Sequence, residues 1–437
     1  MHPSLRRAAA LVVPAALILN TSAAVAAAPD GITLVGKGLV PGTDLDRSGL
    51  TGDICQAGSP GNCVPAALLG GYGSDLDYTG HDGVFIAAPD RGPFDGLTDI
   101  PYPDRVNYFH ITTNVGAAFP NITATLLDTR ILRQADGSPY VGAASAFADR
   151  LDPEGIRVGP DGTFFLSDEY GPYVLEFDRQ GNVIRALDVP DEFEIDHPSG
   201  IAAEELTGNT SGRQANRGME GLAISPDGRT LYGIMQNALL QDNALTPGTT
   251  DRQSVWTRIL KIDVATGATA QYAYQLDAFN RGQGVSEILA IDDHEFLVLE
   301  RDNRSNLQTP PQAPTRKTIY RIDLTGADDV TGVTLPASGP LPGGRQAVSK
   351  ELFIDLLDPD FGLAPTIAEK VEGLAWGPDL ADGRHLLYVI SDNDLNPSLA
   401  TQLYAFAVDD EVAAVAPRTL PGPLFAPGLV QRIVGGR

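Results

Sequence analysis

Apolar residues occur along most of this chain in short runs that are separated by turn-forming residues. One segment shows the pattern clearly, with runs at residues 155–158, 163–167, 173–178 and 182–187. The breaks contain Pro-Asp-Gly, Gly-Pro and Gln-Gly-Asn, which favour tight turns. Apolar positions at a helical period are scarce, so the pattern predicts four short β-strands here and an all-β protein overall.

The same arrangement recurs as a phrase with a fixed order. An acidic residue is followed by an apolar run, a turn, a second apolar run and then polar or charged residues, as in EGIRVGPDGTFFLSDEYG and EGLAISPDGRTLYGIMQN. Counted from the acidic position, the copies begin at Asp75, Glu154, Glu220, Glu287 and Glu372, at intervals of 79, 66, 67 and 85 residues. Units of this length with four strands each predict a β-propeller of about five four-stranded blades, with six as the alternative.

The last unit lacks a clear fourth strand. An early apolar segment, Ile32–Val40, is expected to supply it and so to join the two ends of the chain in one blade. The expected organisation is a signal peptide over residues 1–28, a closing strand and disulfide loop over 29–69, and a propeller domain over 70–437. A ring of blades can reach this length because each unit buries its faces against its neighbours.

The first 28 residues have the composition of a secretory signal peptide. Arg6 and Arg7 precede an apolar run over residues 8–19, and residues 24–28 offer small-residue cleavage sites. The run is too short for a membrane-spanning helix, and no later segment of the sequence is long and apolar enough. We therefore expect an exported protein without membrane insertion, either extracellular or periplasmic.

The two cysteines of the chain, Cys55 and Cys63, flank a short stretch rich in Gly and Pro. In an oxidising compartment they are expected to form one local disulfide that pins a loop. A zinc or redox site is not expected, because the chain has only these two cysteines and lacks C-x-x-C spacing.

The chain is strongly acidic. It contains 31 Lys+Arg and 56 Asp+Glu, and removal of residues 1–28 takes away two arginines, which leaves 29 basic against 56 acidic residues and a net charge of −27. A surface of this sign repels nucleic acids and anionic lipids, so neither is expected as a partner.

The recurring phrase also gathers acidic side chains at one end of the predicted hairpins. In an antiparallel pair the start of the first strand lies beside the end of the second, so Glu154 is expected near Asp168 and Glu169. The other copies pair Asp75 with Asp90 and Arg91, Glu220 with Gln236 and Asn237, Glu287 with Glu300, Arg301 and Asp302, and Glu372 with Asp392 and Asn393. Because the first strand of each blade lines the central channel, all five clusters are expected at one mouth of that channel.

Carboxylates that converge in a partly buried site need compensation, because they cannot all remain ionised. Three forms are open: coordination of a hard cation such as Ca²⁺, pairing with basic residues of the same segments, and retention of a proton by a carboxyl group that acts as general acid or base. Carboxylates and amides with few histidines suit Ca²⁺ or Mg²⁺ better than zinc. For any single glutamate the alternative is structural: it hydrogen-bonds the next blade and sets the register of the ring.

Four segments resemble the phytase-like family, which is described as having esterase-like activity of phytase. They are GGYGSDLDY with GVFIAAPDRGPFDG (residues 70–96), DPEGIRVGPDGTFFLSDEYGP (152–172), NRGMEGLAISPDGRTLYGIMQN (216–237) and KVEGLAWGPD with LYVISDND (370–394). The resemblance extends from about residue 70 to residue 410. It implies an exported propeller that hydrolyses a phosphoric or carboxylic ester.

The first hypothesis is therefore a metal-dependent hydrolase of a small-molecule ester. The ligands expected for its divalent cation, Ca²⁺ above all, are Glu154, Glu220, Glu287, Glu372, Asp302 and Asp392. The residues expected to be catalytic are Glu154, Glu220, Asp168, Glu169, Arg91 and Arg301, of which the two arginines would hold an anionic group. Lactone hydrolysis is a variant of this chemistry. The alternative is a non-catalytic binding propeller in which the cation and the acids only stabilise the ring, and the sequence makes no prediction of the oligomeric state.

Overall fold

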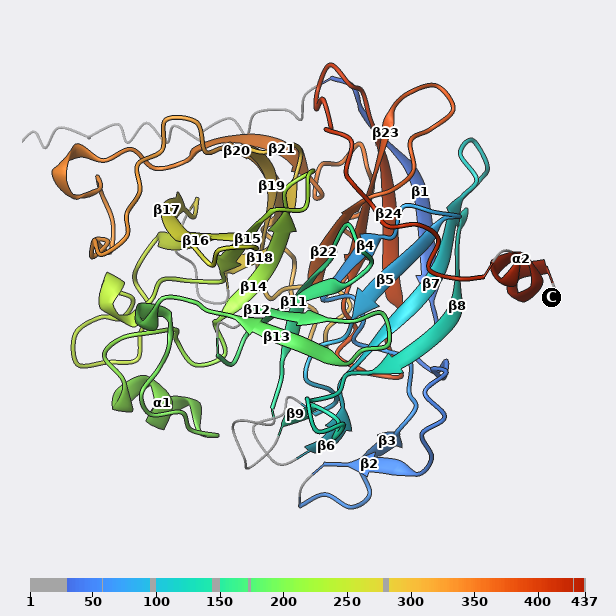
Figure 1. The fold of residues 1–437 in the computed structure, drawn as a ribbon, viewed down its shortest axis with the longest axis horizontal. Coiled ribbons are helices and arrows are strands. Elements are labelled where there is room, and N and C mark those ends of the chain that lie inside the picture. Colours follow the sequence, from blue (N-terminus) through green and yellow to red (C-terminus); the bar gives the residue numbers. More distant parts are fainter. Residues whose placement is uncertain are drawn as a thin grey trace, which may run out of the picture.

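In a computed structural model, the chain forms five four-stranded antiparallel sheets that are arranged as the blades of a propeller (Figure 1). The structure describes residues 30–56, 58–94, 100–143, 150–171, 174–277, 283–426 and 428–435, and the expected signal peptide lies outside them. The predicted all-β propeller is confirmed, and the blade count is five. No helix in the described ranges is long and apolar enough to cross a membrane.

The blades follow one another in chain order. Blade 1 consists of β4 (Asp75–Tyr78), β5 (Val84–Ala88), β7 (Arg105–Thr113) and β8 (Ile122–Ile131); blade 2 of β10 (Pro153–Val158), β11 (Phe164–Asp168), β12 (Val174–Phe177) and β13 (Val183–Leu187); blade 3 of β14 (Met219–Ile224), β15 (Thr230–Met235), β16 (Trp256–Asp263) and β17 (Thr269–Gln275). Blade 4 consists of β18 (Gly284–Ala290), β19 (Glu295–Arg301), β20 (Lys317–Asp323) and β21 (Ser349–Asp355), and blade 5 begins with β22 (Val371–Trp376), β23 (His385–Ser391) and β24 (Thr401–Val408). The first strands of neighbouring blades contact each other and surround the central channel.

The N-terminal strand closes the ring, as predicted. β1 (Ile32–Val40) pairs antiparallel with β24, from Ile32 opposite Val408 to Val40 opposite Thr401. Figure 1 shows this blue strand beside the red strands of blade 5. Pairing of the two ends of the chain in one sheet removes the exposed edges that an open ring would leave.

Smaller elements lie outside the blades. The hairpin of β2 (Asp53–Cys55) and β3 (Cys63–Pro65) and the pair of β6 (Ile100–Pro103) and β9 (Val141–Ala143) lie close together in Figure 1, and two short helices are α1 (Ala202–Gly208) and α2 (Leu429–Gly435). Cys55 and Cys63 form the predicted disulfide across the β2–β3 hairpin.

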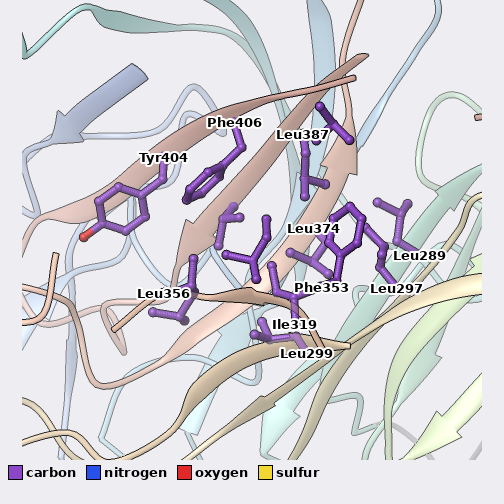
Figure 2. Packing of buried hydrophobic residues seen from close by; sticks show 14 of the residues in the cluster. Leu289, Leu297, Leu299, Ile319, Phe353, Leu356, Leu374, Leu387, Tyr404 and Phe406 are labelled. Carbon is purple, nitrogen blue, oxygen red and sulfur yellow. The ribbon is translucent and has the colours of Figure 1, made fainter. Parts of the chain in front are cut away.

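Hydrophobic clusters fill the space between neighbouring blades. Figure 2 shows such a cluster between blades 4 and 5, with Leu297 and Ile319 on one side and Leu374 and Phe406 on the other. The first two strands of each blade are buried on both faces, because one blade packs on each side of them. This packing fixes the position of the strand ends that form the site.

A fully buried arginine ties the blades together near the middle of the channel. Arg157 on β10 pairs with Asp75 of blade 1 and with Glu287 of blade 4, the latter at 3.0 Å. Its guanidinium also donates to the carbonyl oxygens of Ile288 at 3.1 Å and Leu374 at 3.4 Å. The Glu287 carboxylate in turn accepts the backbone N–H of Leu222 in blade 3, so this network joins all five blades.

The opposite mouth of the channel is crossed by residues 413–421, which we name the C-terminal strap. The strap contacts blade 4 through Ala416 and Ile291, blade 3 through Thr419 and Pro226, and blade 1 through Arg418 and Asp77. Arg418 donates to both carboxylate oxygens of the buried Asp77, at 2.6 and 2.9 Å. The strap covers part of this mouth. The other mouth lies where the first strands of the blades begin, and we call it the upper mouth. The larger cavity of the protein is there.

Candidate functional site

The glutamates of three blades reach the upper mouth because the first strand bulges there. Its pairing with the second strand shifts between Pro153 and Ile156 in blade 2, and the same shift occurs around Glu220 in blade 3 and around Glu372 in blade 5. A bulge inserts an extra residue and turns its side chain away from the regular alternation of the strand. The glycine that follows each of these glutamates lies close to the next blade, where a side chain would not fit: a Cβ on Gly221 would be 2.7 Å from the Cα of Glu287.

The equivalence predicted for Glu287 is wrong by one residue. In blade 4 Val285 pairs with Glu300 and Glu287 pairs with Leu299, which puts Ser286 at the position of Glu220 and Glu287 at the position of Gly221. A one-residue slip sends a strand's side chains to the other side. Glu287 therefore points into the channel toward Arg157 and, like Asp75 of blade 1, belongs to the structural network.

The upper mouth holds a cavity of about 760 Å³ with a mixed lining of acidic and basic side chains. Its acidic lining residues are Asp90, Glu154, Glu169, Glu220, Glu369, Glu372 and Asp394, and its basic ones are Arg91, Arg217, Arg301 and Lys370. The structure thus brings Glu154, Glu169, Glu220, Glu372, Arg91 and Arg301 of the predicted site into one cavity.

The acids of the cavity floor are buried and close together. Glu154 is 8% exposed, and burial, followed by the charges of Glu220 and Asp152, holds its pKa well above the usual range. Within the described ranges the Glu154 side chain accepts no hydrogen bond from the protein. Burial and the hydrogen-bonded carboxyl of Glu169 likewise raise the pKa of Glu220. Two hydrogen-bonded carboxyl groups hold one proton between them.

Two of the predicted arginines are held by these acids. Arg91 donates to Asp152 at 2.5 Å and to Glu169 at 3.4 Å. Arg301 pairs with Glu372 and donates to the Ser286 hydroxyl at 3.0 Å. Both guanidiniums therefore orient carboxylates of the cavity.

Three other predicted residues do not line the cavity: Asp168 and Asp302 hold the backbone of loops, and Asp392 contacts Lys370. Asp168 accepts the backbone N–H groups of Asp152, Tyr170 and Gly171, and thereby fixes the turn that carries Glu169. Asp302 accepts both the N–H and the hydroxyl of Thr315 at 2.7 Å and holds the loop after β19. Asp392 lies behind the cavity wall, 3.5 Å from the Lys370 ammonium. Neither Asp168 nor Asp302 lines the cavity.

The structure adds a residue that the sequence reasoning passed over. One carboxylate oxygen each of Asp152, Glu154 and Glu169 lies within 4.8 Å of the other two. Asp152 was missed although it precedes Glu154 by two residues, a spacing at which alternate strand residues share a side. A second group of the same kind consists of Asp90, Asp392 and Asp394 beside Lys370.

The first of these groups fits a hard divalent cation. Ca²⁺ binds oxygen ligands at about 2.3–2.6 Å, so ligand oxygens around it are separated by up to about 5 Å. The three oxygens lie within that range, and Glu154 brings a buried carboxylate that has no hydrogen-bond donor in the part of the chain that the structure describes. Asp152 would share its charge with Arg91.

The disulfide hairpin forms part of the cavity wall, through Gln56, Asn62, Cys63 and Val64. We expect replacement of Cys55 and Cys63 by serine to raise KM by about 2- to 10-fold with little change in kcat, because the wall must then be ordered when a substrate binds. Steady-state kinetics of the double variant test this expectation. A fall in kcat at unchanged KM would contradict it.

Comparison with known proteins places the chain in a family. The model of the phytase-like family, described as "Esterase-like activity of phytase", matches residues 67–395, so the chain belongs to that family. A relative from Arthroderma benhamiae, named an uncharacterized secreted protein, is 28% identical over 402 residues, which cover 75% of this chain and 73% of the relative.

Two solved structures show distant similarity to the chain. A luciferin-regenerating enzyme has 12% identity and a TM-score of 0.33, covering 84% of this chain and 81% of its own. Regucalcin from Agrobacterium tumefaciens, a calcium-binding protein, has 12% identity and a TM-score of 0.32, covering 73% of this chain and 90% of its own. Similarity at this level carries no argument about the site.

Proposed function

We propose that the protein is a secreted ester hydrolase whose active site is the cavity at the upper mouth and depends on a divalent cation. The observation that carries the proposal is Glu154. It is a buried carboxyl group surrounded by other carboxyl groups, it has no hydrogen-bond donor among the described residues, and it lines a water-accessible cavity. Membership of a family described by esterase-like activity supports the reaction class. Export is supported by the secreted relative and by the disulfide.

In the proposed mechanism each residue has a distinct role. Glu154, whose carboxyl group lines the cavity, accepts a proton from the attacking water. Glu220, whose pKa is raised by burial and by the charge of Glu169, keeps a proton that can be given to the leaving oxygen. Arg91 and Arg301 keep Asp152, Glu169 and Glu372 in place.

Asp152, Glu154 and Glu169 would hold the cation, with Ca²⁺ expected from the all-oxygen ligand set. A bound cation supplies polarisation of the ester or phosphoryl oxygen and lowers the pKa of water. The substrate class is a small-molecule phosphoric or carboxylic ester.

Removal of the cation tests this function. We expect the purified protein to contain a divalent metal, and EDTA to lower hydrolysis of either a nitrophenyl phosphate or a nitrophenyl carboxylic ester by at least about 10²-fold, restored by Ca²⁺. Metal analysis and initial rates provide the measurement, with a lactone as a third substrate.

Two results would contradict the proposal in different ways. Hydrolysis that is unchanged after complete removal of the metal would exclude the cation from the reaction. A protein that binds the metal but hydrolyses none of the three substrates would support a binding propeller instead.

A further inference from the structure

The four cations of the cavity differ in what they contact. Arg91, Arg301 and Lys370 each pair with carboxylates: Arg91 with Asp152, Arg301 with Glu372, and Lys370 with Asp394. The guanidinium of Arg217, in contrast, makes no side-chain hydrogen bond or ion pair with any residue that the structure describes. A partly buried charge is costly without a partner, so an unpaired guanidinium among ion pairs indicates a site for a bound anion.

The backbone presents Arg217 in a fixed position. The turn before it is anchored by the buried Gln214, which donates to the Ala238 carbonyl at 2.8 Å and accepts from Arg252 at 2.8 Å. Gly218 follows directly, and a Cβ there would be 1.9 Å from the carbonyl oxygen of Glu169. The backbone next to Arg217 is therefore held against the strand end that carries Glu169.

The surroundings of Arg217 favour an anion. Burial and the charges of Arg252 and Arg301 lower its pKa to about 10, while Glu220 and Glu169 act in the opposite direction. The group is still charged at neutral pH, is partly desolvated, and has the like charges of Arg252 and Arg301 near it as well as the two glutamates. A bound oxyanion would compensate this charge, and a guanidinium offers two parallel N–H donors to a phosphate or carboxylate.

We propose that Arg217 binds an oxyanion of the substrate, a phosphate or carboxylate group, at the wall of the cavity. The role resembles the one expected from the sequence for Arg91 and Arg301, but those two guanidiniums are occupied by carboxylates of the protein. The binding of an anion by Arg217 stands on the contacts described above. The statement that this anion belongs to an ester substrate rests on the proposed function. It makes Arg217 a residue that selects anionic over neutral esters.

Binding of simple anions tests the site without reference to catalysis. Inorganic phosphate and acetate are titrated separately into EDTA-treated protein by calorimetry, at constant ionic strength. We expect phosphate or acetate to bind, and Arg217→Gln to weaken that binding by about 10- to 100-fold. Arg217→Lys should retain an intermediate affinity, because it keeps the charge without the paired donors. Arg229→Gln is the matched control, since Arg229 is 83% exposed on the same blade and does not line the cavity.

Kinetics with paired substrates provide the second arm. We expect Arg217→Gln to lower kcat/KM for a nitrophenyl phosphate or an ester bearing a carboxylate by about 10- to 100-fold, and to leave kcat/KM for a neutral nitrophenyl ester within a factor of about two. Equal anion affinity in the wild type and Arg217→Gln, or equal losses on charged and neutral esters, would overturn the proposal. Loss of anion binding in a protein that hydrolyses no ester would uphold the Arg217 site and contradict the hydrolase.

Discussion

Replacement of Glu154 by glutamine is expected to lower ester hydrolysis by about 10²- to 10⁴-fold while the propeller stays folded. The amide cannot accept the proton of the attacking water, and it removes a carboxylate ligand from the Asp152–Glu154–Glu169 group. The fold should tolerate the change, because the Glu154 side chain accepts no hydrogen bond from the described part of the protein and its nearest charged neighbours are carboxyl groups. Removal of one of several like charges relieves repulsion.

The measurement combines activity with thermal unfolding in the presence and absence of Ca²⁺. Glu154→Gln should unfold at the wild-type temperature or above it in EDTA, and Ca²⁺ should stabilise it less than it stabilises the wild type, because fewer ligands bind the ion. Glu176→Gln is the matched control: Glu176 is also buried, but it pairs with Arg185 outside the cavity. Full activity of Glu154→Gln would show that another group is the base.

Replacement of Arg157 by methionine is expected to produce the largest loss of stability, about 3–5 kcal/mol in the free energy of unfolding. Arg157 is 0% exposed, and its removal leaves Asp75 and Glu287 buried without a counter-ion. It also removes one donor from the carbonyl oxygens of Ile288 and Leu374. Equilibrium unfolding in urea measures the change.

The charge balance of this network suggests two controls. Asp75 Oδ1 and Glu287 Oε2 are buried without a hydrogen-bond partner among the described residues, and burial raises the pKa of both carboxyl groups. Burial and the charge of Asp75 raise the pKa of Glu287 well above its usual range, so Glu287→Gln should cost little. The triple change Asp75→Asn, Arg157→Met and Glu287→Gln removes every charge of this network. It should therefore recover most of the stability that Arg157→Met loses, and it can be measured even if Arg157→Met alone does not fold. An Arg157→Met protein as stable as the wild type would refute the structural role.

Much of the architecture follows from local pattern. The apolar runs and turns of the repeats predict the strands, and the missing fourth strand of the last unit predicts that Ile32–Val40 closes the ring, as it does through its pairing with Thr401–Val408. These features depend on alternation and turn chemistry, which a sequence carries directly. The hairpin rule also predicts the meeting of Glu154 and Glu169, because both residues lie within one blade.

The failures occur where the backbone departs from regular alternation. Glu287 and Glu372 occupy the same place in the recurring phrase by eye, yet the bulge puts Ser286 at the position of Glu372 and turns Glu287 into the channel. In the sequence, the only sign of this difference is that blade 5 has Glu372-Gly373 where blade 4 has Ser286-Glu287. A shift of one residue reverses the side to which a strand residue points, so reading the phrase could not assign these acids.

The sequence by itself indicates a propeller of five or six blades, its closing strand and the mouth at which acids gather, because these depend on contacts within a blade or between adjacent strands. Only the tertiary structure decides which charged side chains form ion pairs with each other. Arg91 and Arg301 pair with acids brought from other segments, Arg157 takes Asp75 and Glu287 into the channel, and Arg217 alone among the basic residues lining the cavity has no ion pair among the described residues. Such pairing depends on distances between blades, which residue spacing along the chain does not encode.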